Sequence, residues 1–154
     1  MREMIRNRNS ITEYGLHDSR IKKITFAEDN LIFAVDKVFH YSKSGEEQGF
    51  EAEVIFTRCH LEDCWVLVYD GVLSEGKFTG QRMAMQDFIQ QYNHQEFEII
   101  TELHNGYSTF FVGWLWKNKI PVSAQVEIFN FGKMIIRIGK QVFRLNIYTK
   151  GASR

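Results

Sequence analysis

Residues 71–77, Gly-Val-Leu-Ser-Glu-Gly-Lys, have the spacing of a phosphate-binding P-loop. In that motif the glycine-rich backbone wraps the phosphates, the lysine neutralises them, and the next Ser or Thr holds magnesium. Here Phe78 follows Lys77, and Thr79 comes one place late. The helical pattern that follows also begins too late to direct its N-terminus at a phosphate. We therefore predict a glycine-rich connector that binds no nucleotide and, in a chain with no other cofactor motif, no cofactor at all.

Cysteine and histidine occur together in residues 59–64. Cys59, His60 and Cys64 carry thiol and imidazole groups, which are zinc ligands, but a closed zinc site needs four of them. The chain has two cysteines, and its other histidines are scattered without a ligand-type spacing. We expect no metal, and we interpret the cysteines as reduced thiols that pack near each other at the end of a hairpin.

His17, Asp18 and Ser19 are the three residue types of a hydrolase triad. Adjacent positions cannot fold into that geometry, which needs partners from separate segments of the chain. No Gly-x-Ser-x-Gly motif is present either. We predict no catalytic residue here: Asp18 or Ser19 bonds the local backbone at the start of a strand, and His17 is partly exposed.

Aromatic side chains crowd residues 107–116. Phe110, Trp114 and Trp116 share one face of the predicted strand, because alternate residues of a strand point the same way. A central strand covered on both sides explains this pattern, and we favour that interpretation. The alternative is an exposed aromatic patch that anchors a partner, because Trp and Tyr dominate interface energetics.

Carboxylates accompany the aromatic strand. We expect Glu98 and Glu102 to share one face of the neighbouring strand, with Glu127 nearby. Such groups could act as general acid and base or form salt bridges with a basic partner. A solvated sheet face is the interpretation we favour.

Short alternating apolar and polar runs predict the strands that position these residues. Nine segments fit: 19–26, 31–39, 50–59, 64–69, 97–103, 107–116, 122–129, 134–138 and 141–148. The short turns between them favour antiparallel pairing of consecutive strands. We expect one hairpin between the first two segments, another between the next two, and a meander from residue 97 onward. Residues 42–49 resemble a solvated loop.

Residues 81–93 carry the one convincing helical pattern. Thr79 is the expected N-cap and Asn93 suits the end. The helix is too short to be stable alone, so its apolar stripe must dock on a sheet. The stripe consists of Ala84, Met85, Phe88, Ile89 and Tyr92.

The 154 residues, 44% of them hydrophobic, suffice for one core. We predict an α+β fold, mainly antiparallel β, with about nine strands in a meander or two-layer sheet and one amphipathic helix over 81–93. Residues 16–150 would form the domain, and residues 1–15 a loosely ordered arm. The formal net charge of zero disfavours nucleic acid. Without a long apolar run or signal-peptide pattern, we expect a cytoplasmic protein and no membrane contact.

Two segments resemble small bacterial domains that include the immunity proteins of polymorphic toxin systems. The first is Leu-His-Asp-Ser-Arg-Ile at 16–21 with Asp-Asn-Leu-Ile at 29–32. The second is Met-Gln-Asp-Phe-Ile at 85–89 with Phe-Glu-Ile-Ile at 97–100, which is similar to their helix-then-strand layout. The resemblance implies a cytoplasmic, non-enzymatic, β-rich protein. It carries no functional residue over, because these groups share no active site.

We therefore predict a non-enzymatic protein-binding module of the immunity type, which neutralises a toxin partner by occluding it. The alternative is a small enzyme or ligand-binding protein with a cleft near His17 and His60. A homo-oligomer that buries the aromatic strand is a third class. The candidate partner contacts are Trp114, Trp116, Phe110, His17 and Asp18.

Overall fold

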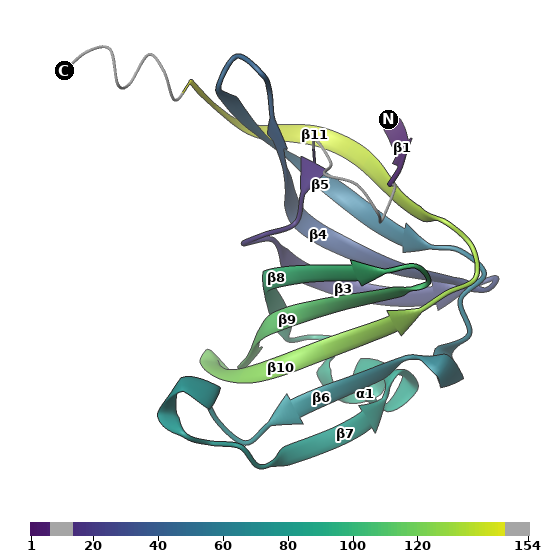
Figure 1. The fold of residues 1–154 in the computed structure, drawn as a ribbon, viewed down its shortest axis with the longest axis vertical. Helices are drawn as coiled ribbons and strands as arrows, with labels where there is room; N and C mark the ends of the chain where they lie inside the picture. Colours follow the sequence, from purple (N-terminus) through teal and green to yellow (C-terminus); the bar gives the residue numbers. More distant parts are fainter. Residues whose placement is uncertain (7–13, 147–154) are drawn as a thin grey trace.

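Eleven strands form one antiparallel sheet in the computed structural model, which describes residues 1–6 and 14–146 (Figure 1). The strands are β1 (Arg2–Ile5), β2 (Tyr14–Gly15), β3 (Arg20–Ala27), β4 (Asn30–Tyr41), β5 (Glu46–Phe56), β6 (Trp65–Tyr69), β7 (Gly80–Ala84), β8 (Glu96–Asn105), β9 (Ser108–Lys117), β10 (Ile120–Phe129) and β11 (Met134–Asn146). The helical segments are η1 (Leu61–Asp63), η2 (Leu73–Glu75) and α1 (Met85–Tyr92). The predicted fold class, mainly antiparallel β with one α-helix, is confirmed.

The sheet bends back on itself, so that its two ends form two layers around one core. The strand order is β1-β11-β5-β4-β3-β8-β9-β10-β6-β7, with β2 paired to β4. Phe111 of β9 nevertheless lies 6.0 Å from Phe33 of β4 and 6.2 Å from Phe56 of β5, measured between ring centroids. The inner faces of the two layers therefore pack on each other. Helix α1 lies behind β6 in Figure 1.

Strand β9 shows how the sequence alternation divides core from surface. Phe111 and Leu115 point inward and are fully buried. Phe110 and Trp116 are half-buried, and Trp114 is 37% exposed. The interpretation that both faces of this strand are covered is therefore wrong. One side of the strand closes the core, and the other side is partly exposed, with Trp114 its most exposed aromatic residue.

The helix begins later than predicted. Residues 80–84 form β7, which pairs with β6, and Ala84 takes the N-cap position. Thr79 does not cap the helix, because its hydroxyl donates to a carboxylate oxygen of Asp70 at 2.6 Å. The predicted docking stripe is confirmed, and its buried members are Met85, Phe88 and Tyr92.

The strand pairing departs from a chain of hairpins. The β3–β4 hairpin and the β8-β9-β10 meander form as predicted. The expected hairpin of β5 with β6 does not form, because β5 pairs with β4 and β11, and β6 pairs with β7 and β10. Likewise β11 leaves the meander and pairs with β5. Both connections carry the chain from one layer to the other.

The N-terminal segment is more ordered than the predicted arm. Residues 2–5 form β1, which pairs with β11, and residues 14–15 form β2, which pairs with β4. The rest of that arm, residues 7–13, and the predicted strand end at 147–148 lie outside the described residues. Residues 46–49 belong to β5 rather than to a solvated loop. Within the described parts of the chain, no helix is long and apolar enough to cross a membrane.

Candidate interaction surface

The outward sides of β9 and β6 carry aromatic and aliphatic side chains, whereas solvated sheet faces are usually polar, and the polar residues Ser123, Gln125 and Glu127 of β10 lie between them. All three tryptophans of the chain lie on this side of the layer. We call this surface the aromatic face, and it consists of Phe110, Val112, Trp114, Trp116, Trp65 and Leu67.

The strand register sets these side chains in rows. Glu127 of β10 lies between Phe110 and Trp65, its direct partners on β9 and β6. These three residues and Arg82 help to line a shallow depression of about 100 Å³. The Arg82 guanidinium stacks over the Trp65 ring at 3.9 Å. Within the described residues, the Glu127 carboxylate has no salt-bridge partner.

Among the described residues, the outward side of the other layer has no tryptophan and carries an ion-pair cluster beside a row of isoleucines, Ile5, Ile135, Ile55 and Ile32. There Arg137 of β11 donates to Glu3 of β1 at 2.8 Å and to Glu53 of β5 at 3.4 Å. These three residues form the charged face. The two layers are thus covered differently on the outside, although their inner faces share one core.

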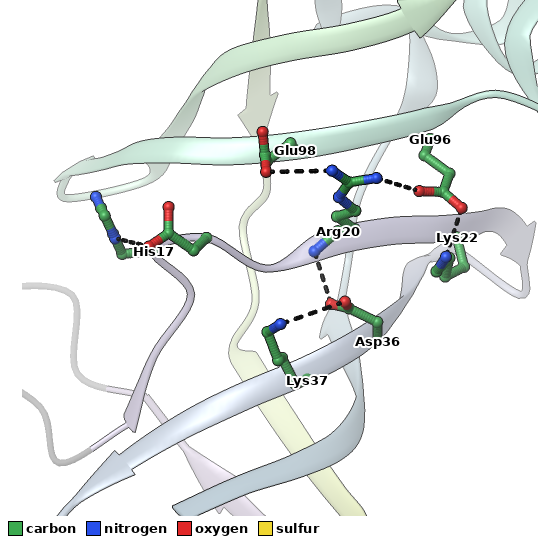
Figure 2. A network of polar contacts seen from close by, with 8 residues as sticks. His17, Arg20, Lys22, Asp36, Lys37, Glu96 and Glu98 are labelled. Atoms are coloured by element: carbon green, nitrogen blue, oxygen red, sulfur yellow. Dashed lines mark hydrogen bonds and ion pairs between the residues drawn. The ribbon is translucent and has the colours of Figure 1, made fainter. Parts of the chain in front are cut away.

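Arg20 lies where the two layers join and borders the aromatic face. Its guanidinium contacts Glu96 at 3.1 Å and Glu98 at 3.6 Å, as Figure 2 shows. The same guanidinium lies over the ring of Trp116, 5.1 Å from the ring centroid. Arg20 therefore supports one edge of the aromatic face while it neutralises two carboxylates.

The polar network extends to both sides of Arg20 (Figure 2). Lys22 pairs with Glu96, and the backbone N–H of Arg20 donates to Asp36 at 2.7 Å. Lys37 lies 3.9 Å from the same Asp36. Hydrogen bonds from Lys22 and then Arg20 lower the pKa of Glu96, and the hydrogen bond to Glu96 raises the pKa of Arg20.

We expect Glu96→Gln to lower the free energy of unfolding by about 0.5–1 kcal/mol at pH 7, since surface pairs contribute little. The pKa of Glu96 is lowered by folding. The stabilisation that ionised Glu96 provides is therefore present when the pH is above its unfolded-state pKa of about 4.3. It is lost as the pH falls through the folded-state pKa. Urea denaturation of Glu96→Gln and of the unaltered protein, at pH 7 and at pH 3, measures the difference in the free energy of unfolding.

The matched control is Glu51→Gln, which removes an exposed carboxylate with no ion pair among the described residues. An equal loss of stability in both variants, or a Glu96→Gln loss that is as large at pH 3 as at pH 7, would contradict the assigned role of Glu96.

His17 and Asp18 lie close together on the surface. Their side chains are 3.0 Å apart, Nδ1 to Oδ2, and both are more than half exposed. Ser19 is fully buried, so the three residues form no hydrolase triad. The left-handed backbone of Asp18, with φ of 65°, turns the chain at this point. Both side chains remain available to a partner.

A buried polar cluster on the inner side of β8 has the order hydroxyl–imidazole–carboxylate. His104 contacts the Thr109 hydroxyl at 3.1 Å and Glu102 at 3.0 Å, and Arg6 pairs with Glu102. Thr109 is fully buried, so a substrate cannot reach its hydroxyl. Sequence reasoning missed this cluster because Arg6 is remote in the chain and gives no local signal.

The expectation that Glu98 and Glu102 share a face is wrong. A register shift between Ile99 and Thr101 inserts one extra residue into β8. As a result Glu98 lies opposite outward-facing Trp114, whereas Glu102 lies opposite inward-facing Phe111. A bulge of this kind reverses the faces of all residues beyond it.

The remaining motifs form no catalytic or metal centre. Cys59 and Cys64 lie side by side as predicted, and both thiols contact the carbonyl oxygen of Phe129. His60 contacts Cys64 through its backbone oxygen and not through its imidazole. No group of three or more potential metal ligands occurs among the described residues. Residues 71–79 lead into β7 rather than into a helix, and the hydroxyl of Ser123 accepts the N–H of Leu73.

His60 borders an open groove of about 690 Å³ between the β3–β4 turn, η1 and α1. Its other walls include Phe26, Asp29, Glu62 and Ile89. His17 does not line this groove, so the two histidines are not joined in one cleft. The groove offers one imidazole, two carboxylates and an apolar floor.

Comparisons with known proteins give no match: no family model, no curated protein and no solved structure corresponds to the chain.

Proposed function

We propose that the protein is a non-enzymatic, cytoplasmic protein-binding module whose aromatic face binds a partner protein. The observation that carries this proposal is the placement of every tryptophan on the outward side of one layer. Trp contributes strongly to protein interfaces, and contiguous exposed apolar surface is uncommon on monomers. The charged face of the same sheet is the internal comparison, because ion pairs rather than aromatic rings occupy it.

The charges on the aromatic face indicate the chemistry of the partner. Glu96 and Glu98 are neutralised by Arg20, whereas Glu127 sits in the depression between Phe110 and Trp65 without an ion pair among the described residues. A Lys or Arg with apolar neighbours would satisfy this carboxylate and cover both rings. We therefore propose a partner protein with an apolar surface around one basic side chain.

An immunity-type role fits this proposal. A module that covers a toxin needs a broad, preformed surface and no catalytic residues of its own. A sheet face held by a packed core is rigid, so little ordering entropy is lost on binding. The toxin would then be neutralised by occlusion of its functional surface.

The groove beside His60 supports a second candidate function, the binding of a small ligand or substrate. Its imidazole and the Asp29 and Glu62 carboxylates share one groove with apolar residues. This combination resembles many small-molecule sites, although the groove is open to solvent. The same experiment can separate the two functions.

We expect Trp114→Ala to weaken binding of the partner by about thirtyfold or more, because loss of an interface tryptophan removes about 2 kcal/mol or more. The partner is captured from native cells with the intact protein, identified by mass spectrometry, purified, and titrated by calorimetry. Trp65→Ala tests the other side of the face, and Glu127→Gln tests the basic contact.

The matched controls are Arg137→Ala on the charged face and His60→Ala in the groove. Both should bind the partner as the unaltered protein does, and circular dichroism checks the fold of every variant. Full binding by Trp114→Ala and Trp65→Ala would contradict the proposal. Loss of binding in His60→Ala alone would favour the groove.

A further inference from the structure

The thiols of Cys59 and Cys64 meet beneath a single turn of the chain. Their sulfur atoms are 3.5 Å apart, and both residues are fully buried. The backbone of Cys59 pairs with Asn130 and donates to Asp29 at 2.8 Å. The N–H of Cys64 donates to Leu61 at 3.0 Å. Both backbones are thus held in place, with the sulfurs already in contact.

We propose that Cys59 and Cys64 form an oxidative modification site, at which hydrogen peroxide converts the two thiols into an intramolecular disulfide. This inference is independent of the aromatic face. It rests on the sulfur contact, on the shared burial and on the single short turn that joins the two residues.

The reaction needs one thiolate and one neighbouring thiol. The S–H···S contact raises the pKa of Cys59 and lowers the pKa of Cys64, so Cys64 is the more acidic partner. Its thiolate attacks one peroxide oxygen, the O–O bond breaks, and after protonation Cys64 is a sulfenic acid and one water has left.

The second step closes the disulfide. The sulfur of Cys59 attacks the sulfur of the Cys64 sulfenic acid, the S–O bond breaks, and the Cys59 proton leaves with the hydroxyl as water. Two thiols and one peroxide thus give one disulfide and two waters. Peroxide is the oxidant that gains the two electrons.

The turn between the two cysteines gives a small oxidant a route to the sulfurs. Residues 61–63 form η1, a single turn held by N–H···O bonds from Asp63 to His60 and from Cys64 to Leu61, each 3.0 Å long. Glu62 and Asp63 on this turn are exposed. Opening one turn admits a small molecule without unfolding the sheet. Closing the sulfur gap from 3.5 Å to a bond length of about 2.05 Å also needs only local movement.

The test treats the reduced, full-length protein with excess hydrogen peroxide and measures intact mass. We expect most molecules to lose two hydrogen atoms, and the loss to map to tryptic fragment 59–77, which contains both cysteines. Dithiothreitol should reverse it. In the folded protein, a bulky aromatic disulfide should modify the thiols much more slowly than it does in urea.

Two variants identify the attacking sulfur. Cys59→Ser keeps a hydrogen-bond donor beside Cys64 and should accumulate a sulfenic acid that a cyclic 1,3-dione traps. Cys64→Ser places the same donor beside Cys59, and it should give less trapped product when Cys64 is the attacking thiol. Equal trapping in both variants would overturn the assignment of Cys64 as the attacking thiol.

The unaltered protein decides the main proposal even if a variant fails to fold. Thiols that survive peroxide in the folded protein, or disulfides that join two molecules, would overturn it. Circular dichroism before and after oxidation shows whether the protein remains folded during the reaction.

Discussion

We expect Phe111→Ala to lower the free energy of unfolding by about 3–5 kcal/mol. Phe111 is fully buried, and its ring packs on Phe33 and Phe56 of the opposite layer. Alanine there removes apolar contacts and leaves a cavity that two rigid strands cannot close. Urea denaturation followed by circular dichroism measures the effect.

Trp114→Ala, three residues further along β9, is the matched control. Its side chain is exposed on the opposite face of the strand. We expect this variant to change stability by about 1 kcal/mol or less, as is usual for surface positions. If the control were the more destabilising of the two, the assignment of inner and outer faces to β9 would be wrong. The pair thus separates a residue that holds the layers together from one available to a partner.

The second large effect is expected at Gly113. A Cβ atom at this position would lie 1.8 Å from the carbonyl oxygen of Glu98 and 3.1 Å from the N–H nitrogen of Ile100. Both obstacles are backbone atoms of β8 beside its bulge, so neither can rotate away. We expect Gly113→Ala to destabilise the protein by about 3 kcal/mol or more, at the upper end of overpacking effects.

Gly15→Ala is the control for Gly113→Ala, measured in the same denaturation experiment. The nearest atom to a Cβ there is a ring carbon of Tyr41 at 3.8 Å, an ordinary contact distance. We expect a change within about 0.5 kcal/mol, because a restricted unfolded chain offsets a small strand effect. Comparable losses in both variants would show that the close approach of β8 is not what requires glycine.

Local patterns predicted the elements of this fold better than their pairing. Alternation placed Phe111 and Trp114 on opposite faces of one strand, but it could not show which face meets solvent, because both are apolar. Which face of β9 meets solvent depends on which strands stack across the core, and this stacking joins residues that are far apart in the chain. The register shift in β8 is likewise set by its partner, so the separation of Glu98 and Glu102 had no sequence signal.

Pairing between distant strands also explains why the ends of some elements were predicted wrongly. Residues 80–84 fit a helical stripe, but pairing with β6 overrides that preference and makes them a strand. Arg2 to Ile5 show little periodicity, and β1 exists because β11 offers it a hydrogen-bonding edge. The contact between Cys59 and Cys64 was predictable, since a short turn brings both ends of residues 59–64 together.

The position of β11 has a consequence for how the protein is made. This strand is the last of those described, yet it lies between β1 and β5 in the sheet. Until it leaves the ribosome, β1 has no strand partner among the described residues, and one edge of β5 stays open. A nascent chain can thus assemble the β8-β9-β10 meander early but cannot close its core until β11 has emerged. Exposed sheet edges invite mispairing, so the order of synthesis leaves this sheet dependent on rapid insertion of β11.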